Sequence, residues 1–240
     1  MTMKTSCIVA FLFVVLVGGT WLLLRPADES SLAPVATESL AAQGIVPSAA
    51  DGTYRLVPGA SQMRWQGRRP LIQGYFDNGT IAIASGQAVV ADDALLSGSV
   101  VVDMTTINAS TTGRGDGEDR LTQHLKSADW FDVEQYPESR FVINEAPIQD
   151  DGTVLLIGML TIQDRTHPLR FPVTVAQQAD TLVIVATDIP IDRTQWDIRY
   201  GSGSFFDNLG EQLIDDIFTL SFTAVFELDS AAAAASLKLQ

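Results

Sequence analysis

The chain has 240 residues and is acidic: 29 Asp and Glu residues stand against 15 Lys and Arg residues, and the formal net charge is −14. A surface of that sign repels phosphate backbones, which excludes nucleic acid as the principal partner. The lysines are far apart in the sequence, so no basic cluster is available to bind anionic lipid. The single cysteine excludes a disulfide bond within the chain.

Residues 1–25 are predicted to form a signal-anchor or transmembrane segment. The apolar run at 7–24 would span about 27 Å as a helix, close to the hydrocarbon thickness of a bilayer. A cleaved signal peptide is the alternative, because Gly18 and Gly19 offer small residues for a cut, although the apolar run resumes after them. Lys4 and the free amino terminus favour that end inside the cell. Both alternatives predict export, either as a single-pass protein of the bacterial inner membrane with its folded domain in the periplasm or as a periplasmic protein.

Three segments follow this run. Residues 26–52 are rich in Ala, Ser and Pro with scattered acidic residues, and they predict a flexible acidic linker. Residues 53–229 have the length of one β-barrel or sandwich and are predicted to form a single folded domain. Residues 230–240 are rich in alanine and have no strand pattern, so we expect this tail to be disordered.

From residue 54 onward the sequence consists of short β segments separated by turn residues. The clearest alternation lies at 218–226, where every second residue is apolar and the residues between are mostly threonine or serine. The other expected strands lie at 62–66, 80–84, 87–91, 96–104, 140–145, 154–162, 169–176 and 182–189. Residues favoured in turns separate the strands at 77–79, 92–93, 150–152 and 178–180.

Two stretches depart from the strand pattern. Residues 119–130 place Leu121, Leu125 and Ala128 at helical spacing and predict a short helix, and residues 201–216 read as a glycine-rich loop with room for one helical turn. Eight or nine strands with one or two short helices predict an all-β domain, either a closed barrel or a sandwich.

The predicted interior is apolar. Several strands are apolar on both faces, and in a barrel an apolar lumen is a place to hold a hydrophobic ligand. Alternation predicts which side chains face this lumen and would contact such a ligand: Met63, Ile81, Ile83, Phe141, Ile143, Phe218, Leu220, Phe222 and Phe226.

Residues 124–141 read HLKSADWFDVEQYPESRF. This segment resembles the hallmark of the YceI-like, polyisoprenoid-binding family, whose pattern is close to HL-x-S-x-x-F-F-D-V-x-x-Y-P-x-x-x-F. Further matches cover the rest of the predicted domain: Gly74-Tyr75-Phe76, Thr112-Gly113, residues 158–162 with Pro168-Leu169, residues 191–193 ahead of Trp196, and residues 215–220.

The resemblance implies an elongated, lipocalin-like barrel of eight antiparallel strands, with a tunnel that holds an isoprenoid chain such as a quinone tail or a polyprenyl group. It also places the segment around Arg193 and Trp196 near a barrel end, where the two residues are candidates to contact a polar head group. Arg193 has a second interpretation, a structural ion pair with the acidic residues around it. The acidic charge favours a neutral quinone over a polyprenyl phosphate, although local arginines could offset it.

Two functions follow from this sequence. The first is a carrier or reservoir that shelters an isoprenoid lipid outside the cytoplasmic membrane, and the second is a structural or adaptor barrel with a self-filled core and a protein partner. We expect no enzyme and no cofactor, because no Ser-His-Asp arrangement or phosphate-binding loop is evident. Asp215 and Asp216 are more simply explained by a turn than by paired catalytic carboxylates. Two histidines are too few for a metal site.

Overall fold

The computed structural model describes residues 50–113 and 115–230. The predicted signal-anchor at 1–25, nearly all of the linker at 26–52 and the tail after Ser230 lie outside the described residues. Within the described part, every helix is too short or too polar to span a bilayer.

The described residues form an all-β domain with one α-helix. The strands are β1 (Gly52–Leu56), β2 (Gln62–Arg68), β3 (Phe76–Ala91), β4 (Ala94–Thr111), β5 (Glu138–Glu145), β6 (Val154–Ile162), β7 (Arg165–Gln178), β8 (Thr181–Asp192) and β9 (Ile217–Leu228). The helix α1 (Glu118–Lys126) lies between β4 and β5, and short 3-10 turns form η1 (Pro58–Ala60), η2 (Arg193–Trp196) and η3 (Gly210–Gln212).

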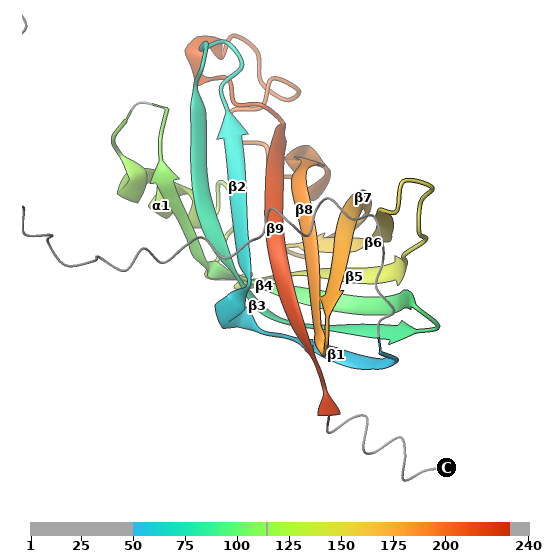
Figure 1. The fold of residues 1–240 in the computed structure, drawn as a ribbon. Helices are drawn as coiled ribbons and strands as arrows, with labels where there is room; N and C mark the ends of the chain where they lie inside the picture. The colour runs from blue at the N-terminus through green and yellow to red at the C-terminus, as the bar shows by residue number, and fades with distance from the viewer. Residues whose placement is uncertain (1–49, 114, 231–240) are drawn as a thin grey trace, which may run out of the picture. The chain divides into compact units, whose positions relative to one another are not determined.

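The strands form one antiparallel sheet that closes on itself (Figure 1). From β3 the pairing runs through β4, β5, β6, β7 and β8 to β9, and both β1 and β2 lie between β9 and β3. The two short strands β1 and β2 therefore occupy the same place in the barrel, between β9 and β3. The nine strands form a barrel that is eight strands around. The predicted eight-stranded antiparallel barrel is confirmed.

The interruption between β1 and β2 has a local cause. Pro58 has no backbone N–H to donate to the ladder, and η1 begins at this residue. The backbone N–H of Val57 still donates to the carbonyl oxygen of Val225 at 2.8 Å, and the backbone N–H of Val225 donates to the Ser61 hydroxyl at 3.0 Å. These two bonds keep the neighbouring strand β9 paired across the break.

The long strands β3 and β4 differ from the sequence prediction. Residues 80–84 and 87–91 were expected as separate strands after a turn at 77–79, but all of them belong to β3, whose pairing with β4 shifts register at several points. The predicted turn at 77–79 is wrong because its residues make cross-strand contacts. Asp77 accepts from the backbone N–H of Gly113 at 3.0 Å, and the Asn78 side chain bonds to Gln66 and Thr111.

Three other local predictions, a turn, a helix and a strand, agree with the structure in whole or in part. The Asp92-Asp93 turn joins β3 to β4 with both residues at positive φ, 52° and 60°, the conformation that a two-residue hairpin demands. The expected helix at 119–130 is present but ends at Lys126, where Ser127 becomes extended and its side chain donates to the His124 carbonyl oxygen. Of the strands, β6 matches its predicted range of 154–162.

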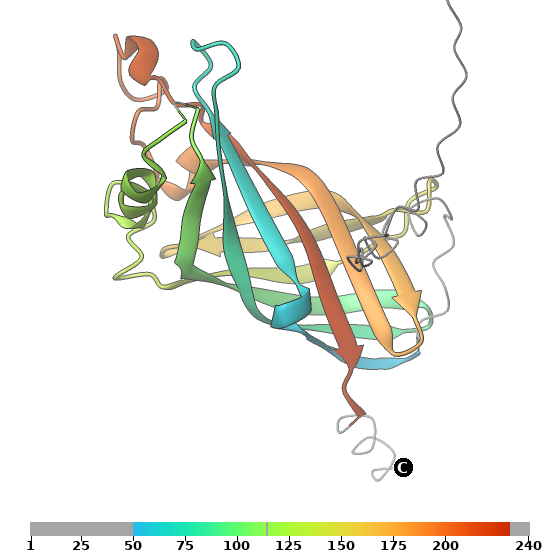
Figure 2. The same ribbon diagram turned by 60° about the vertical axis from the view of Figure 1, so that its left-hand side comes forward.

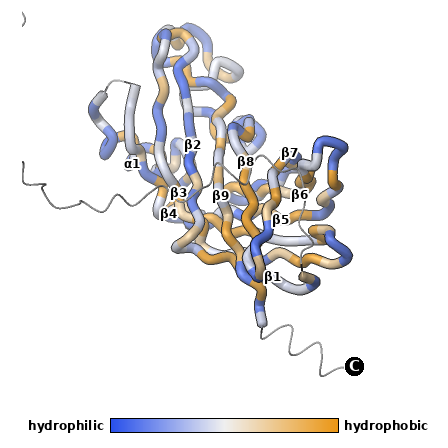
Figure 3. The backbone as a smooth tube through the Cα atoms, in the orientation of Figure 1, coloured by the Kyte–Doolittle hydropathy of each residue, from blue (hydrophilic) through white to orange (hydrophobic). Residues whose placement is uncertain are grey.

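One end of the barrel carries most of the non-strand structure. The connection between β2 and β3, the helix α1 and the segment from η2 to β9 all gather there (Figure 2). Hydrogen bonds join two of these parts, since the backbone N–H of Asp215 donates to the Arg68 carbonyl oxygen at 3.0 Å and Arg69 donates to the Glu211 carbonyl oxygen at 3.0 Å. Figure 3 shows apolar positions mostly along the strands and hydrophilic positions mostly in their connections.

Gly79 has less room for a side chain than any other described glycine, and it yields a test of the fold. A Cβ atom at this position would lie 1.8 Å from the Asn108 carbonyl oxygen and 2.5 Å from the Trp65 indole nitrogen. We expect Gly79→Ala to lower the free energy of unfolding by about 3 kcal/mol or more, a fall in Tm of roughly 6–12 °C.

Gly67→Ala is the matched control, because a Cβ on this glycine in β2 would meet nothing within 4 Å. Thermal unfolding of both variants beside the parent protein tests the packing. Equal melting temperatures for the two variants would show that β3 and β4 do not approach each other in this way.

Candidate ligand-binding cavity

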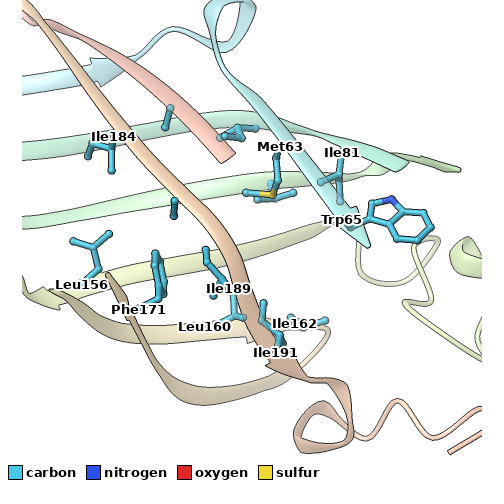
Figure 4. Close-up of a cluster of buried hydrophobic side chains, with 14 of the residues drawn as sticks. Met63, Trp65, Ile81, Leu156, Leu160, Ile162, Phe171, Ile184, Ile189 and Ile191 are labelled. Carbon is cyan, nitrogen blue, oxygen red and sulfur yellow. The ribbon is translucent and has the colours of Figure 1, made fainter. Parts of the chain in front are cut away.

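The barrel encloses a cavity of about 570 Å³. Inward-facing residues of β2 to β9 line it, and the size lies within the range of small-molecule sites. In Figure 4, side chains such as Met63, Leu156 and Phe171 project from different strands toward one shared interior. The barrel wall therefore forms most of the cavity, and α1 and the connections between strands contribute at one end.

The structure places all nine of the sequence-predicted tunnel residues in the lining of this cavity: Met63, Ile81, Ile83, Phe141, Ile143, Phe218, Leu220, Phe222 and Phe226. Strand alternation brings them together, because alternate residues of each strand face inward. On β9 the inward series also includes Ala224. Contact of these residues with a ligand stays a prediction.

The middle of the cavity is almost entirely apolar. Aromatic rings form part of its wall, with Phe171 5.3 Å from Phe141 and 6.1 Å from Phe222 between ring centroids. The buried polar side chains here are few, chiefly Ser139, which is 8% exposed. Such a wall excludes water and favours a hydrocarbon occupant.

The cavity is closed at the end where β1 lies. The lining stops at Ala88 on β3, Leu156 on β6, Phe171 on β7 and Ile184 on β8. The next inward residues along these strands are buried without touching the cavity and pack with two residues of β1: Val90, Val154, Val173, Leu182, Tyr54 and Leu56. The interior is therefore a pocket with a packed floor and not a tunnel open at both ends.

The opposite end, where α1 lies, is the mouth. Charged and polar lining residues gather there from three segments: Arg68, Arg69, Asp77, Asp116, Arg120, His124, Arg193, Tyr200 and Asp215. Several of them are exposed, among them Arg120 and Tyr200. An apolar pocket with polar groups confined to one end matches an amphiphile with a long apolar tail and a small polar head.

Arg193 is buried at this end, with 1% of its side chain exposed. Its guanidinium donates to the carbonyl oxygens of Ile198 at 2.8 Å, Asp215 at 3.1 Å and Ile214 at 3.3 Å, and it lies 3.4 Å from the Asp216 carboxylate. Burial lowers the pKa of the Arg193 side chain, an effect that Asp216 and the other nearby carboxylates oppose. The geometry therefore matches the structural interpretation of Arg193, although the residue also borders the cavity.

Trp196 lies behind the cavity wall. It is 1% exposed, its indole N–H donates to the Leu160 carbonyl oxygen at 3.2 Å, and its ring packs edge-on against His167. It is absent from the cavity lining, so the structure does not place it where a ligand head group would contact it.

Sequence reasoning missed the aromatic residues of the mouth. Trp130 follows α1 and Tyr200 follows η2, and both line the cavity with His124. The ring centroids of His124 and Tyr200 are 4.4 Å apart, and the Arg193 guanidinium lies 5.0 Å from the Trp130 ring. Strand alternation gives no direction for these side chains because they lie outside the strands.

Exposed apolar side chains surround the mouth. Leu71 in the β2–β3 connection is 63% exposed, and Phe205 and Phe206 in the segment before η3 are 44% and 51% exposed. Phe76 at the start of β3 and Tyr200 are also largely exposed. Among the described residues, no group of three or more His, Cys, Asp or Glu side chains could hold a metal ion.

A closed antiparallel barrel around an apolar pocket defines the class of small β-barrels with an interior large enough for a ligand. Residues 54–226 match the model of the YceI-like domain, so the chain belongs to the YceI-like family.

Two solved structures share the fold. BcnA of Burkholderia cenocepacia is 20% identical with a TM-score of 0.55, and the match covers 71% of this chain and 98% of BcnA. A polyisoprenoid binding domain from Saccharophagus degradans, implicated in plant cell wall breakdown, is 12% identical with a TM-score of 0.53, and the match covers 73% of this chain and 98% of that domain. No curated protein matches this chain in sequence.

The structural interpretation of Arg193 can be tested with Arg193→Lys. Lysine carries its donors on one nitrogen and cannot reach the separated carbonyl oxygens that the guanidinium fork serves. We expect a loss of about 3 kcal/mol in the free energy of unfolding, because buried acceptors lose their partners. Arg170→Lys on β7, where the side chain is exposed, is the control. An Arg193→Lys protein that melts with the parent but loses ligand would make Arg193 a ligand-binding cation instead.

Proposed function

We propose that this barrel binds an isoprenoid lipid with its tail in the apolar pocket, and that it shelters the lipid outside the cytoplasmic membrane as a carrier or reservoir. The observation that carries this proposal is the pocket itself, whose middle and floor are almost entirely apolar and whose charged side chains lie at its mouth. Membership of the YceI-like family supports the proposal. So does the similar fold of a domain described as polyisoprenoid-binding.

The physical driving force is removal of the tail from water. Burial of about 300 Å² of apolar surface would contribute roughly 7 kcal/mol before the costs of association. The alternative, a barrel filled by its own side chains that acts as an adaptor, is disfavoured by an empty interior of about 570 Å³. Catalysis has no place in the proposal, since the pocket offers hydrophobic contact along most of its length.

Within this proposal, a neutral head group such as a quinone fits the mouth better than a phosphate. The charge of Arg193 is compensated by Asp216, and Arg68 forms an ion pair with Asp215. Two further carboxylates, Asp77 and Asp116, also border the mouth. With Arg69 and Arg120, four arginines lie near four aspartates, so the local charges are nearly balanced, and the rest of the protein is acidic.

The location of the protein belongs to the same proposal. The predicted anchor at 1–25 would hold the barrel at the periplasmic face of the inner membrane, and a flexible linker of this length has a root-mean-square reach of roughly 30 Å. The exposed apolar side chains around the mouth support exchange of lipid with an apolar surface.

The pocket predicts which lipid is recovered with the protein. The full chain, purified without detergent, should release an isoprenoid into organic solvent, identified by mass spectrometry. Ala224→Phe should shift the recovered tails to shorter lengths by about one or two isoprene units, because the added ring would fill the space above the floor over roughly one inward step of β9.

Ala84→Phe is the matched control, because Ala84 is exposed on β3 and is not part of the lining. It should leave the recovered lipid unchanged. Recovery of fatty acids or phospholipids alone, with no isoprenoid, would contradict the proposed function. An unchanged tail length in Ala224→Phe would show that the floor does not limit the ligand.

The proposed location predicts the outcome of proteolysis. Protease added to intact spheroplasts should release the barrel by cutting the linker at 26–52, while the folded domain resists cleavage. A cytoplasmic protein measured in parallel reports whether the spheroplasts are intact. Full protection of the barrel in intact spheroplasts, with cleavage after lysis, would place the domain in the cytoplasm.

A further inference from the structure

Trp130 differs from the other two tryptophans of the barrel. The indole N–H of Trp65 donates to the Asn108 carbonyl oxygen at 3.0 Å, and that of Trp196 donates to the Leu160 carbonyl oxygen at 3.2 Å. The indole nitrogen of Trp130 is buried and has no hydrogen-bond partner in the structure. Because an indole nitrogen can only donate, and a buried donor without a partner costs about 1–3 kcal/mol, this position calls for an acceptor.

The Trp130 side chain is held firmly at the mouth of the pocket. It is only 9% exposed and lines the cavity. Its backbone N–H donates to the Ser127 carbonyl oxygen at 3.1 Å, and its own carbonyl oxygen accepts from the Gln163 side chain at 2.8 Å. Because the indole nitrogen itself is buried, a ligand acceptor would reach it after a neighbouring side chain moves, and the packed indole would then lose little side-chain entropy.

The surroundings of Trp130 favour a neutral, flat head group. His124 and Tyr200 present rings to it at centroid distances of 6.2 and 6.1 Å. The Arg193 guanidinium, 5.0 Å from the centre of the Trp130 ring, already donates to three carbonyl oxygens and lies near Asp216. The indole N–H is therefore offered among aromatic rings and beside a charge that the protein has compensated.

Arg69, at the same end of the barrel, also has a buried donor without a hydrogen-bond partner. The Nε atom of Arg69 is buried without a partner, while another nitrogen of this guanidinium donates to the Glu211 carbonyl oxygen and its carbon lies 5.3 Å from the centre of the Tyr75 ring. Arg69 and Tyr75 both line the cavity. Among the described residues, the remaining buried side-chain atom without a partner is the Gln177 oxygen, and Gln177 lies outside the lining.

We infer that Trp130 recognises the polar end of the ligand by donating its indole N–H to a neutral carbonyl oxygen of a flat ring, as in a quinone. This inference rests on the proposed function and adds the residue and the atom that select the head group. Tyr200, 45% exposed, is the ring of this cluster that can move aside for the ligand without uncovering the core.

The test compares two probes with the same prenyl tail, a prenylated benzoquinone and the prenyl hydrocarbon without a head group. Their affinities for the full chain are measured by displacement of a fluorescent lipid. In Trp130→Phe, which keeps an aromatic ring but removes the donor, quinone affinity should fall about tenfold, since one hydrogen bond and its buried donor are involved. Affinity for the hydrocarbon should stay within twofold.

Trp65→Phe is the matched control, because Trp65 also lines the pocket but its N–H is already bonded to Asn108. It should leave the ratio of quinone to hydrocarbon affinity unchanged. In the parent protein with ¹⁵N-labelled tryptophan, the indole resonance that Trp130→Phe removes should shift when quinone is added and stay in place when hydrocarbon is added.

The remaining outcomes are distinct. Equal losses for both probes in Trp130→Phe would make the residue purely structural and overturn the inference while leaving lipid binding intact. Displacement of quinone by a prenyl phosphate of equal tail length, unaffected by Trp130→Phe, would replace it with an anion site. Failure of the parent protein to bind either quinone or hydrocarbon would instead overturn the proposed function.

Discussion

Closure of the sheet between β9 and β3 is the constraint on which the rest of this structure depends. The gap is filled by two short strands that pair with both neighbours, β1 near one end and β2 near the other, with η1 between them. Without this pairing, β3 and β9 would present open edges, and their inward side chains would face water. Closure turns the alternation of each strand into an inside and an outside, and the cavity is a direct consequence.

The interior is packed at one end of the barrel and hollow toward the other. Toward β1, side chains such as Tyr54 and Leu182 are fully buried and pack to fill the space. Toward α1, the inward residues of the same strands leave an empty volume, and the atoms that line it lack contacts on one side. A ligand that binds only the folded protein restores those contacts and adds stability by mass action, about 2.7 kcal/mol when its concentration is a hundred times Kd.

The sequence predicts which side chains form the wall of the pocket, but not its packed floor near β1 or its mouth near α1. Alternation identifies Phe222 and its neighbours as inward-facing, because a strand leaves only two choices of face. It does not show that the lumen is packed below Ala88, since that depends on which residues meet across the barrel. Aspartate is common in turns, so the sequence predicts a turn at Asp77. In the structure its carboxylate instead accepts a hydrogen bond from the backbone N–H of Gly113, which is distant in sequence. Trp130 and Tyr200 lie outside the strands, where no short-range pattern gives the direction of a side chain.

The sequence allowed two interpretations of Arg193, a structural ion pair or a contact with a ligand head group, and the contacts around it match the first. This arginine is surrounded by carbonyl oxygens and a carboxylate, so its donors maintain the connection between η2 and the segment before β9. A charge used in this way has little left to offer a ligand, because moving it would strand several buried acceptors. Trp130, which packs against that guanidinium, has the opposite balance: its ring is fixed and its one donor is free. A compensated cation beside an unpaired neutral donor would let the site select a carbonyl oxygen without attracting anions, and the acidic exterior would reinforce that selection.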